Sequence, residues 1–150
     1  MMKKNILNQE TKAEIINRIK KLTPHAERAW GNLTINEMMF HCSKVTNLIL
    51  DAKPSNTKAG LKQRFIKLMG LHIIKHFPKG VQTESKYLKT KDDNLSFEEE
   101  QNNFIQTIER AADYKQDIYG SHSLFGPLNT KEWRRFLWMH TDHHLRQFNV

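Results

Sequence analysis

Helix-start signals recur along this chain and divide it into segments. In a capping box, a hydroxyl side chain at the N-cap and a carboxylate three residues later satisfy free amide groups at the helix N-terminus. Such a box occurs three times, with its members at Thr11 and Glu14, at Thr34 and Glu37, and at Ser96 and Glu99. A fourth start is expected after Pro127, with Thr130 as N-cap. Four helix starts with little sign of strands predict an all-α chain built as a bundle.

Apolar residues behind each start have helical spacing, so each predicted helix has an inward face. The expected faces are Ile15, Ile16, Ile19 and Leu22 in the first helix, Met38, His41, Val45 and Leu48 in the second, Phe104, Ile105, Ile108, Ala111 and Ala112 in the third, and Trp133, Leu137, His140, His144 and Phe148 in the fourth. We expect the first helix to end at Thr23 and Pro24, because proline disfavours helical geometry in the residue before it.

The second helix is expected to end within residues 51–54 and the third near Tyr119 and Gly120. Residues 59–77 are predicted to form one or two short helices, interrupted at Gly70, and an extended loop is expected from there to about residue 94.

The length of 150 residues suits one domain, and we expect residues 1–150 to form it. No apolar run approaches the roughly 20 residues that a membrane-spanning helix needs, so we expect no membrane partner. The basic start of the chain lacks the apolar run of a signal peptide. The single cysteine, Cys42, agrees with a reducing compartment. These features predict a cytoplasmic protein.

The formal net charge of +8 admits three interpretations. The lysines and arginines are spread along the chain, and no RNA-binding motif or Cys/His finger accompanies them. This favours a solvated basic surface over a nucleic-acid partner. An anionic small-molecule substrate is a third interpretation that the charge alone does not separate from the first.

Three of the eight histidines fall within five positions, at His140, His143 and His144. Helical side chains four residues apart lie on one face with Cβ atoms about 6 Å apart. The imidazoles of His140 and His144 can therefore converge on one metal ion, which binds ligand nitrogens at about 2.0–2.1 Å. His41 lies on the inward face of another helix and completes a set of three, whereas His143 lies off the shared face.

The sequence therefore predicts a metal site made of His41, His140 and His144. The competing interpretation is a group of ordinary core histidines, but burying several imidazoles without partners is costly. A four-cysteine zinc site is excluded by the cysteine count. The glutamate of the zinc-protease motif H-E-x-x-H is absent because Thr141 follows His140, so peptide hydrolysis of that type is disfavoured.

Three nitrogen ligands leave coordination positions open, as in catalytic zinc sites. An ion of this kind lowers the pKa of a bound water or thiol and polarises an oxygen as a Lewis acid. Cys42 follows His41 directly, and successive helical residues diverge by about 100°. We therefore expect Cys42 to be a small buried apolar residue rather than a reactive thiol.

Other polar and aromatic residues are candidates for supporting roles around this site. Gln147 follows His144 by one turn and is expected to hydrogen-bond to a ligand. Asp142 is expected either to hydrogen-bond to a ligand in the same way or to be exposed. His122 either approaches the open side of the metal or caps the loop before the last helix. Trp133, like Trp30, is expected in the core or in a pocket wall.

Two C-terminal motifs resemble a known family. Residues 122–128 read H-S-L-F-G-P-L, and residues 140–148 read H-T-D-H-H-L-R-Q-F, with Trp133 between them. This combination resembles a branch of the DinB-like superfamily that is known only as a domain of unknown function. Residues 22–24, 30–31 and 34–41 fit the N-terminal half of the same branch, and the resemblance is weakest within residues 52–94.

The resemblance implies an up-down-down-up four-helix bundle with a metal between its second and fourth helices. The ligand triad of the superfamily carries over onto His41, His140 and His144. Metals found in such proteins include zinc and nickel. Relatives include thiol transferases and a thiol-dependent isomerase, which use bacillithiol, mycothiol or glutathione. Many members look like dimers, so a homodimer is an expectation of the resemblance.

Three functional hypotheses follow. The leading one is a metal-dependent thiol-S-transferase, in which a low-molecular-weight thiol attacks an electrophile held against the basic surface. The second is a non-catalytic metal-binding or stress-associated protein. The third, nucleic-acid binding, is the least favoured and rests on the charge and on the name of the superfamily, which comes from a damage-inducible gene.

Overall fold

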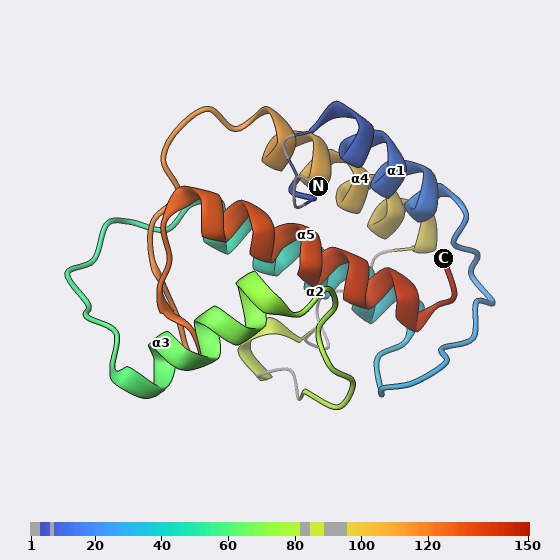
Figure 1. The fold of residues 1–150 in the computed structure, drawn as a ribbon. Coiled ribbons are helices and arrows are strands. Elements are labelled where there is room, and N and C mark those ends of the chain that lie inside the picture. Colours follow the sequence, from blue (N-terminus) through green and yellow to red (C-terminus); the bar gives the residue numbers. More distant parts are fainter. Residues whose placement is uncertain (1–3, 7, 82–84, 89–95) are drawn as a thin grey trace.

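The computed structural model describes residues 4–6, 8–81, 85–88 and 96–150, and most of these residues are helical (Figure 1). The elements are α1 (Gln9–Lys20), α2 (Ile35–Leu50), α3 (Leu61–Lys67), the π-helix η1 (Leu68–Ile73), the 3₁₀-helix η2 (Ser85–Tyr87), α4 (Phe97–Asp113), β1 (Ser121–His122), β2 (Gly126–Pro127) and α5 (Thr130–Gln147). The strands form one short antiparallel pair. The described residues are mostly helical, in line with the predicted all-α class, and this hairpin is the one departure among them.

Capping decides where the long helices begin. The boxes predicted at Thr34 and Ser96 are confirmed, because each hydroxyl accepts from the backbone amide three residues on and each glutamate accepts from the backbone amide of the N-cap residue. The predicted N-cap at Thr11 is wrong. Asn8 caps α1 through its side chain, and Thr11 is a buried residue inside the helix.

The N-cap of α5 is also one residue earlier than predicted. Asn129 forms a capping box with Glu132. The hydroxyl of Thr130 donates instead to the Asp117 carboxylate and accepts from the Ile118 amide, at 3.0 and 3.1 Å. Both partners belong to the segment before the hairpin. Because this tertiary contact occupies the Thr130 hydroxyl, Asn129 rather than Thr130 caps the helix.

Two of the predicted helix ends are wrong, and one is close. Helix α1 ends at Lys20, ahead of the predicted stop at Thr23 and Pro24. Helix α4 ends at Asp113 rather than near Tyr119, because Tyr114 turns extended and its hydroxyl donates to the Leu50 carbonyl at 2.8 Å. Helix α2 ends at Leu50, next to the predicted range of 51–54.

The four long helices pack in pairs. Each of α1 and α2 contacts both α4 and α5. In Figure 1, α1 and α5 run from left to right and α2 and α4 run the opposite way. Their apolar faces meet in one core, whose fully buried members include Ile15, Ile19, Met38, Phe104, Ile108, Leu137, Met139 and Leu145. Of the expected inward residues, Leu48 is half exposed.

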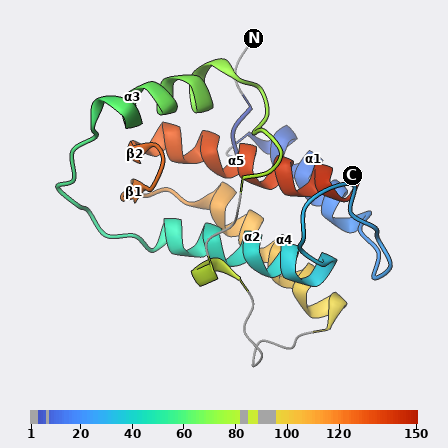
Figure 2. The same cartoon turned by 90° about the horizontal axis from the view of Figure 1, so that it is seen from below.

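The connection between α2 and α4 covers the side of α2 and α5 that faces away from α1 (Figure 2). Here η1 contacts α5, α3 contacts β2, and η2 contacts α2. The predicted interruption at Gly70 is wrong, since α3 continues into η1 across it. A Cβ at Gly70 would lie 2.7 Å from Phe125 Cε1, so glycine is needed for η1 to approach the hairpin loop. The predicted loop to residue 94 lies partly outside the described residues.

Within the described residues, no helix combines the length and apolar character needed to cross a bilayer.

Candidate metal site

Two neighbouring helices bring three histidines together. His41 lies in the second turn of α2, and His140 and His144 lie on successive turns of α5. Because α2 and α5 pack against each other, the side chain of His41 meets the face that His140 and His144 share. One nitrogen from each ring lies within 4.8 Å of the others, so the three residues can hold a metal ion.

The rings form a nearly equilateral arrangement. Their centroids are 4.9 Å apart for His41 and His140, 4.7 Å for His41 and His144, and 4.6 Å for His140 and His144. The Nε2 atoms of His41 and His140 are 3.0 Å apart. Two nitrogens bound to one ion at the usual length would be about 2.8–3.4 Å apart for bond angles near 90–109°. This pair is therefore spaced as ligands of one ion are.

Hydrogen bonds fix the outer nitrogens of two of these rings. His41 Nδ1 lies 3.2 Å from the Tyr87 carbonyl oxygen, and His144 Nδ1 lies 2.6 Å from Gln147 Oε1. Since an oxygen of this kind accepts, each Nδ1 carries the proton and donates it. The lone pair of each ring is then on Nε2, which faces the other histidines. This is the usual outer arrangement around metal-binding histidines.

All three imidazoles are neutral near pH 7. Burial lowers the pKa of His41 to about 4, opposed by the Tyr87 carbonyl and assisted by the charge of His143. Burial and then the neighbouring His41 lower the pKa of His144 to about 3. Burial, followed by the charges of His144 and His41, takes the pKa of His140 well below its ordinary value. Neutral imidazoles are the form that binds metals.

The arrangement fits a cation on electrostatic grounds. Two lone pairs cannot face each other at 3.0 Å without a positive centre or a proton between them. A proton on His140 Nε2 would let that nitrogen donate to His41 Nε2, but it would leave His144 Nε2 without a partner. His140 Nδ1 is also buried with no hydrogen-bond partner among the described residues. A metal ion serves all three Nε2 atoms at once.

A cavity of about 1010 Å³ opens beside the three histidines, and all three line it. Its walls come from α2 and the segment before it, from α3, η1 and η2, and from α5 and the hairpin, and most of the lining residues are apolar. They include Leu33, Val45, Ile49, Ile66, Met69, Ile74, Phe77, Phe125, Trp133 and Phe136. An ion held by the histidines would therefore have its free positions next to a large apolar space.

The structure places the other predicted residues as follows. Trp133 is buried in the cavity wall, and Trp30 lines the cavity too. Gln147 accepts from His144, as described above. His122 lines the cavity, where its ring stacks on Phe125 at 4.6 Å, and its Nδ1 accepts from the Leu124 amide at 3.1 Å within the loop before α5.

Three nearby polar residues lie outside the histidine cluster. His143 is directed toward Trp30, at 6.0 Å between ring centroids. Cys42 is fully buried beside Met38, and burial raises the pKa of its thiol well above the ordinary value. This is the environment of a small core residue. Asp142 is buried rather than exposed, and its carboxylate contacts Arg18 instead of the histidine cluster.

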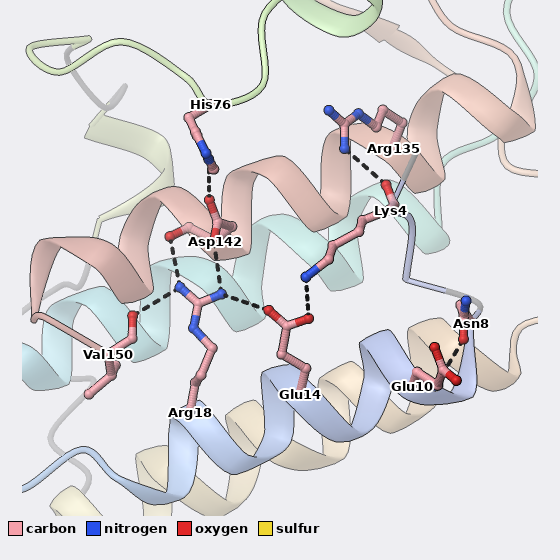
Figure 3. Close-up of polar contacts among 9 residues, drawn as sticks. All are labelled: Lys4, Asn8, Glu10, Glu14, Arg18, His76, Arg135, Asp142 and Val150. Carbon is pink, nitrogen blue, oxygen red and sulfur yellow. Dashed lines mark hydrogen bonds and ion pairs between the residues drawn. The ribbon is translucent and has the colours of Figure 1, made fainter. Parts of the chain in front are cut away.

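Asp142 joins α5 to α1 and to the end of the α3–η1 connection (Figure 3). Its carboxylate accepts from Arg18 at 2.8 Å and lies 2.9 Å from His76 Nδ1. Arg18 also donates to the Val150 carbonyl at 2.9 Å. The contact ties three parts of the chain together on the side of α5 away from the histidines.

Sequence reasoning missed two residues that support the site. The Tyr87 acceptor is a backbone carbonyl, so no side-chain pattern could reveal it. Gly31 has a positive φ of 83°, and a Cβ there would overlap the Gln147 amide. The Trp30 and Gly31 pair was part of the resemblance seen in the sequence, but the resemblance gave the glycine no role.

Comparison with known proteins gives one finding. A family model described as a protein of unknown function, DUF1569, matches residues 1–150. Neither the curated proteins nor the solved structures contain a significant match.

Proposed function

The chain belongs to the DinB-like family DUF1569, and we propose that it binds one divalent transition metal through His41, His140 and His144. In this proposal α1, α2, α4 and α5 are the up-down-down-up four-helix bundle of that superfamily. Their pairing and their directions in Figure 1 support this assignment. The observation that carries the proposal is the convergence of three neutral imidazoles, with the outer nitrogens of His41 and His144 already hydrogen-bonded.

Zinc or nickel is the proposed metal. Imidazole nitrogens suit borderline transition metals, whereas magnesium and calcium prefer oxygen ligands. No carboxylate belongs to the cluster among the described residues. This donor set therefore favours a transition metal over magnesium or calcium.

We further propose that the protein is a metal-dependent thiol-S-transferase that uses a low-molecular-weight thiol. When bound, the ion supplies Lewis acidity that lowers the pKa of a coordinating thiol. The sulfur forms a bond to an electrophilic carbon while the bond from that carbon to its leaving group breaks, its electron pair goes to the leaving group, and the thiol proton passes to the leaving group or to solvent. The chain itself supplies the apolar cavity, which holds the electrophile and excludes water, and Lys86, a cation in the cavity lining.

Elemental analysis tests the metal. Protein purified without a metal-affinity tag is expected to carry about one zinc or nickel per chain. His140→Ala should abolish the occupancy, whereas His25→Ala, at an exposed histidine far from the cluster in sequence, should keep it. Equal occupancy in the two variants, or none in the parent after incubation with zinc and nickel, would refute the site.

Thiol consumption tests the reaction. With the site loaded, glutathione, bacillithiol and mycothiol are each combined with a panel of apolar electrophiles. A rate above background that is lost in His140→Ala supports a transferase. A background rate across the whole panel, with a large fall in melting temperature on metal removal, would refute the transferase and favour a structural metal.

A further inference from the structure

The positive charge of this protein is concentrated in one connection. Residues 52–81, here called the basic arm, contain seven lysines and arginines and no aspartate or glutamate. Their formal net charge of +7 compares with +8 for the whole chain. The basic residues outside the arm are nearly balanced by acids, so the spread of charge along the sequence conceals a cationic segment.

The basic arm also exposes large apolar side chains. Leu61, Phe65, Leu68 and Ile73 are 86, 65, 51 and 58 % exposed. The spacing of Leu61, Phe65 and Leu68, four and then three residues, places them on one face where α3 continues into η1. Contiguous exposed apolar residues of this kind mark an interaction surface.

No other element covers this face in the described part of the chain. The backbone of α3 lies against η1 and β2, and Figure 2 shows the helix at the edge of the molecule, away from α1 and α4. Lys62 and Arg64 are exposed among the apolar residues and form no ion pair with any described residue, whereas Lys67 is paired with Glu132.

From these observations we propose that the basic arm binds the surface of a bilayer that contains anionic phospholipids. A helix with apolar side chains on one face and lysine or arginine beside them lies in the plane of the lipid headgroups. There its cations meet lipid phosphates and its apolar side chains enter the acyl boundary. This mode needs no spanning helix, and it departs from our expectation, based on run length, that the chain has no membrane partner.

The combination of positive charge and exposed apolar side chains favours a membrane surface over a nucleic acid or a second copy of the chain. A nucleic acid would use the cations but would leave Leu61 and Leu68 in water. A second copy of the same face would bring two arms of like charge together. An anionic surface with an apolar layer beneath it uses both features.

The arm also borders the cavity. Phe65 and Met69 line the cavity beside the histidines and are exposed as well. On a bilayer, this edge of the cavity would therefore lie next to lipid. The proposal does not depend on the metal or on thiol chemistry.

Vesicle flotation tests the proposal with the full chain. The probes are vesicles of phosphatidylcholine alone and of phosphatidylcholine mixed with phosphatidylserine. We expect binding only to the mixed vesicles, weakened by added salt. Lys62→Glu with Arg64→Glu and, separately, Leu61→Ser with Leu68→Ser should each lower the partition by about tenfold. Lys20→Glu with Lys21→Glu makes the same charge change at the end of α1 and should retain binding.

Several results would overturn it. One is no binding to the mixed vesicles at low salt. Another is an equal loss of vesicle binding in the control variant with Lys20→Glu and Lys21→Glu, which would show that binding depends on the overall charge of the protein and not on the basic arm. Retained binding in Leu61→Ser with Leu68→Ser would point to a polyanion such as nucleic acid. A concentration-dependent dimer that this variant dissociates, without vesicle binding, would assign the face to a second copy. Circular dichroism checks that each variant is folded.

Discussion

The bond between His144 and Gln147 sets which nitrogen of the ring faces the cluster. At 2.6 Å, the Gln147 carbonyl oxygen holds the proton on Nδ1 and leaves Nε2 free. Gln147→Leu removes this acceptor and is expected to weaken metal binding by about 10–100-fold while leaving the fold intact. Competition with a chromophoric chelator measures the affinity. Gln147→Glu keeps an acceptor and should retain tight binding; an unchanged affinity in Gln147→Leu would contradict the role.

Gly31 supports the same contact from the opposite side. Its φ of 83° is unfavourable for other residues, and a Cβ there would displace the Gln147 amide. Gly31→Ala should therefore lower both the free energy of unfolding, by about 1–2 kcal/mol, and the metal affinity. Gly80→Ala is the matched control, since Gly80 also has a positive φ but has open space around it. If the two variants bind metal equally, Gly31 has no part in positioning Gln147.

The lowered pKa values of the histidines make the metal-free protein sensitive to acid. His41 and His144 have pKa values of about 4 and about 3 when folded, against the ordinary value of 6.5 for a histidine. Between these values the unfolded chain binds more protons, so the free energy of unfolding falls as the pH drops below 6.5 and levels off only near pH 3. Each pKa unit corresponds to about 1.4 kcal/mol.

Urea unfolding of metal-free protein at a series of pH values measures this dependence. His41→Gln removes one of the groups with a lowered pKa, so the stability of this variant should change less between pH 6.5 and pH 4. The same pH dependence in the variant and the parent would show that burial does not lower the pKa of His41.

At this scale the sequence could predict the three histidines and Gln147 because they lie at helical spacings on strongly periodic segments. The Tyr87 carbonyl and the Gly31 contact could not be predicted, since each joins the site to a segment with no fixed spacing to it. The burial of Asp142 could not be decided either, because its partner Arg18 lies 124 residues away.

Among the elements, the ends are the least predictable part. The capping boxes at Thr34 and Ser96 depend only on four consecutive residues, so the sequence predicted them. The end of α4 depends on a bond from Tyr114 to Leu50, and the cap of α5 depends on Thr130 being used by Asp117 and Ile118. Both are tertiary contacts, so a local pattern placed these boundaries wrongly.

The attachment of α5 to α1 gives a prediction for stability. Asp142→Ala removes the buried carboxylate partner of the largely buried Arg18 and should lower the free energy of unfolding by about 2–4 kcal/mol. Asp113→Ala breaks a pair with Lys12 whose carboxylate is exposed, and should cost about 1 kcal/mol or less. Urea denaturation compares the two. Similar losses would mean that the Asp142 contact is no stronger than a surface ion pair.

For the molecule as a whole, the sequence predicted the helical class and the inward faces but not the cavity. The cavity depends on how η1 and the hairpin lie over α2 and α5, and Gly70 permits that approach through its contact with Phe125. Its expected role as a helix breaker was wrong because a wide π-helical turn accommodates it.

Metal binding should be visible in global stability. An ion that binds only the folded chain adds about 2.7 kcal/mol at a hundredfold excess over its dissociation constant, which is about 5–10 °C in melting temperature for a chain of this size. Calorimetry of metal-free protein with and without zinc measures the shift. His140→Ala should show none, and an equal shift in that variant would place the binding elsewhere.

The three tryptophans differ in their relation to the cavity, and this gives the protein an optical reporter of its own site. Trp30 and Trp133 line the cavity, whereas Trp138 packs beneath Arg135 at 4.9 Å and does not line it. A paramagnetic ion such as nickel, or an apolar ligand in the cavity, should change the emission of the first two and leave the third as a constant background. Occupancy can thus be followed by intrinsic fluorescence without a label.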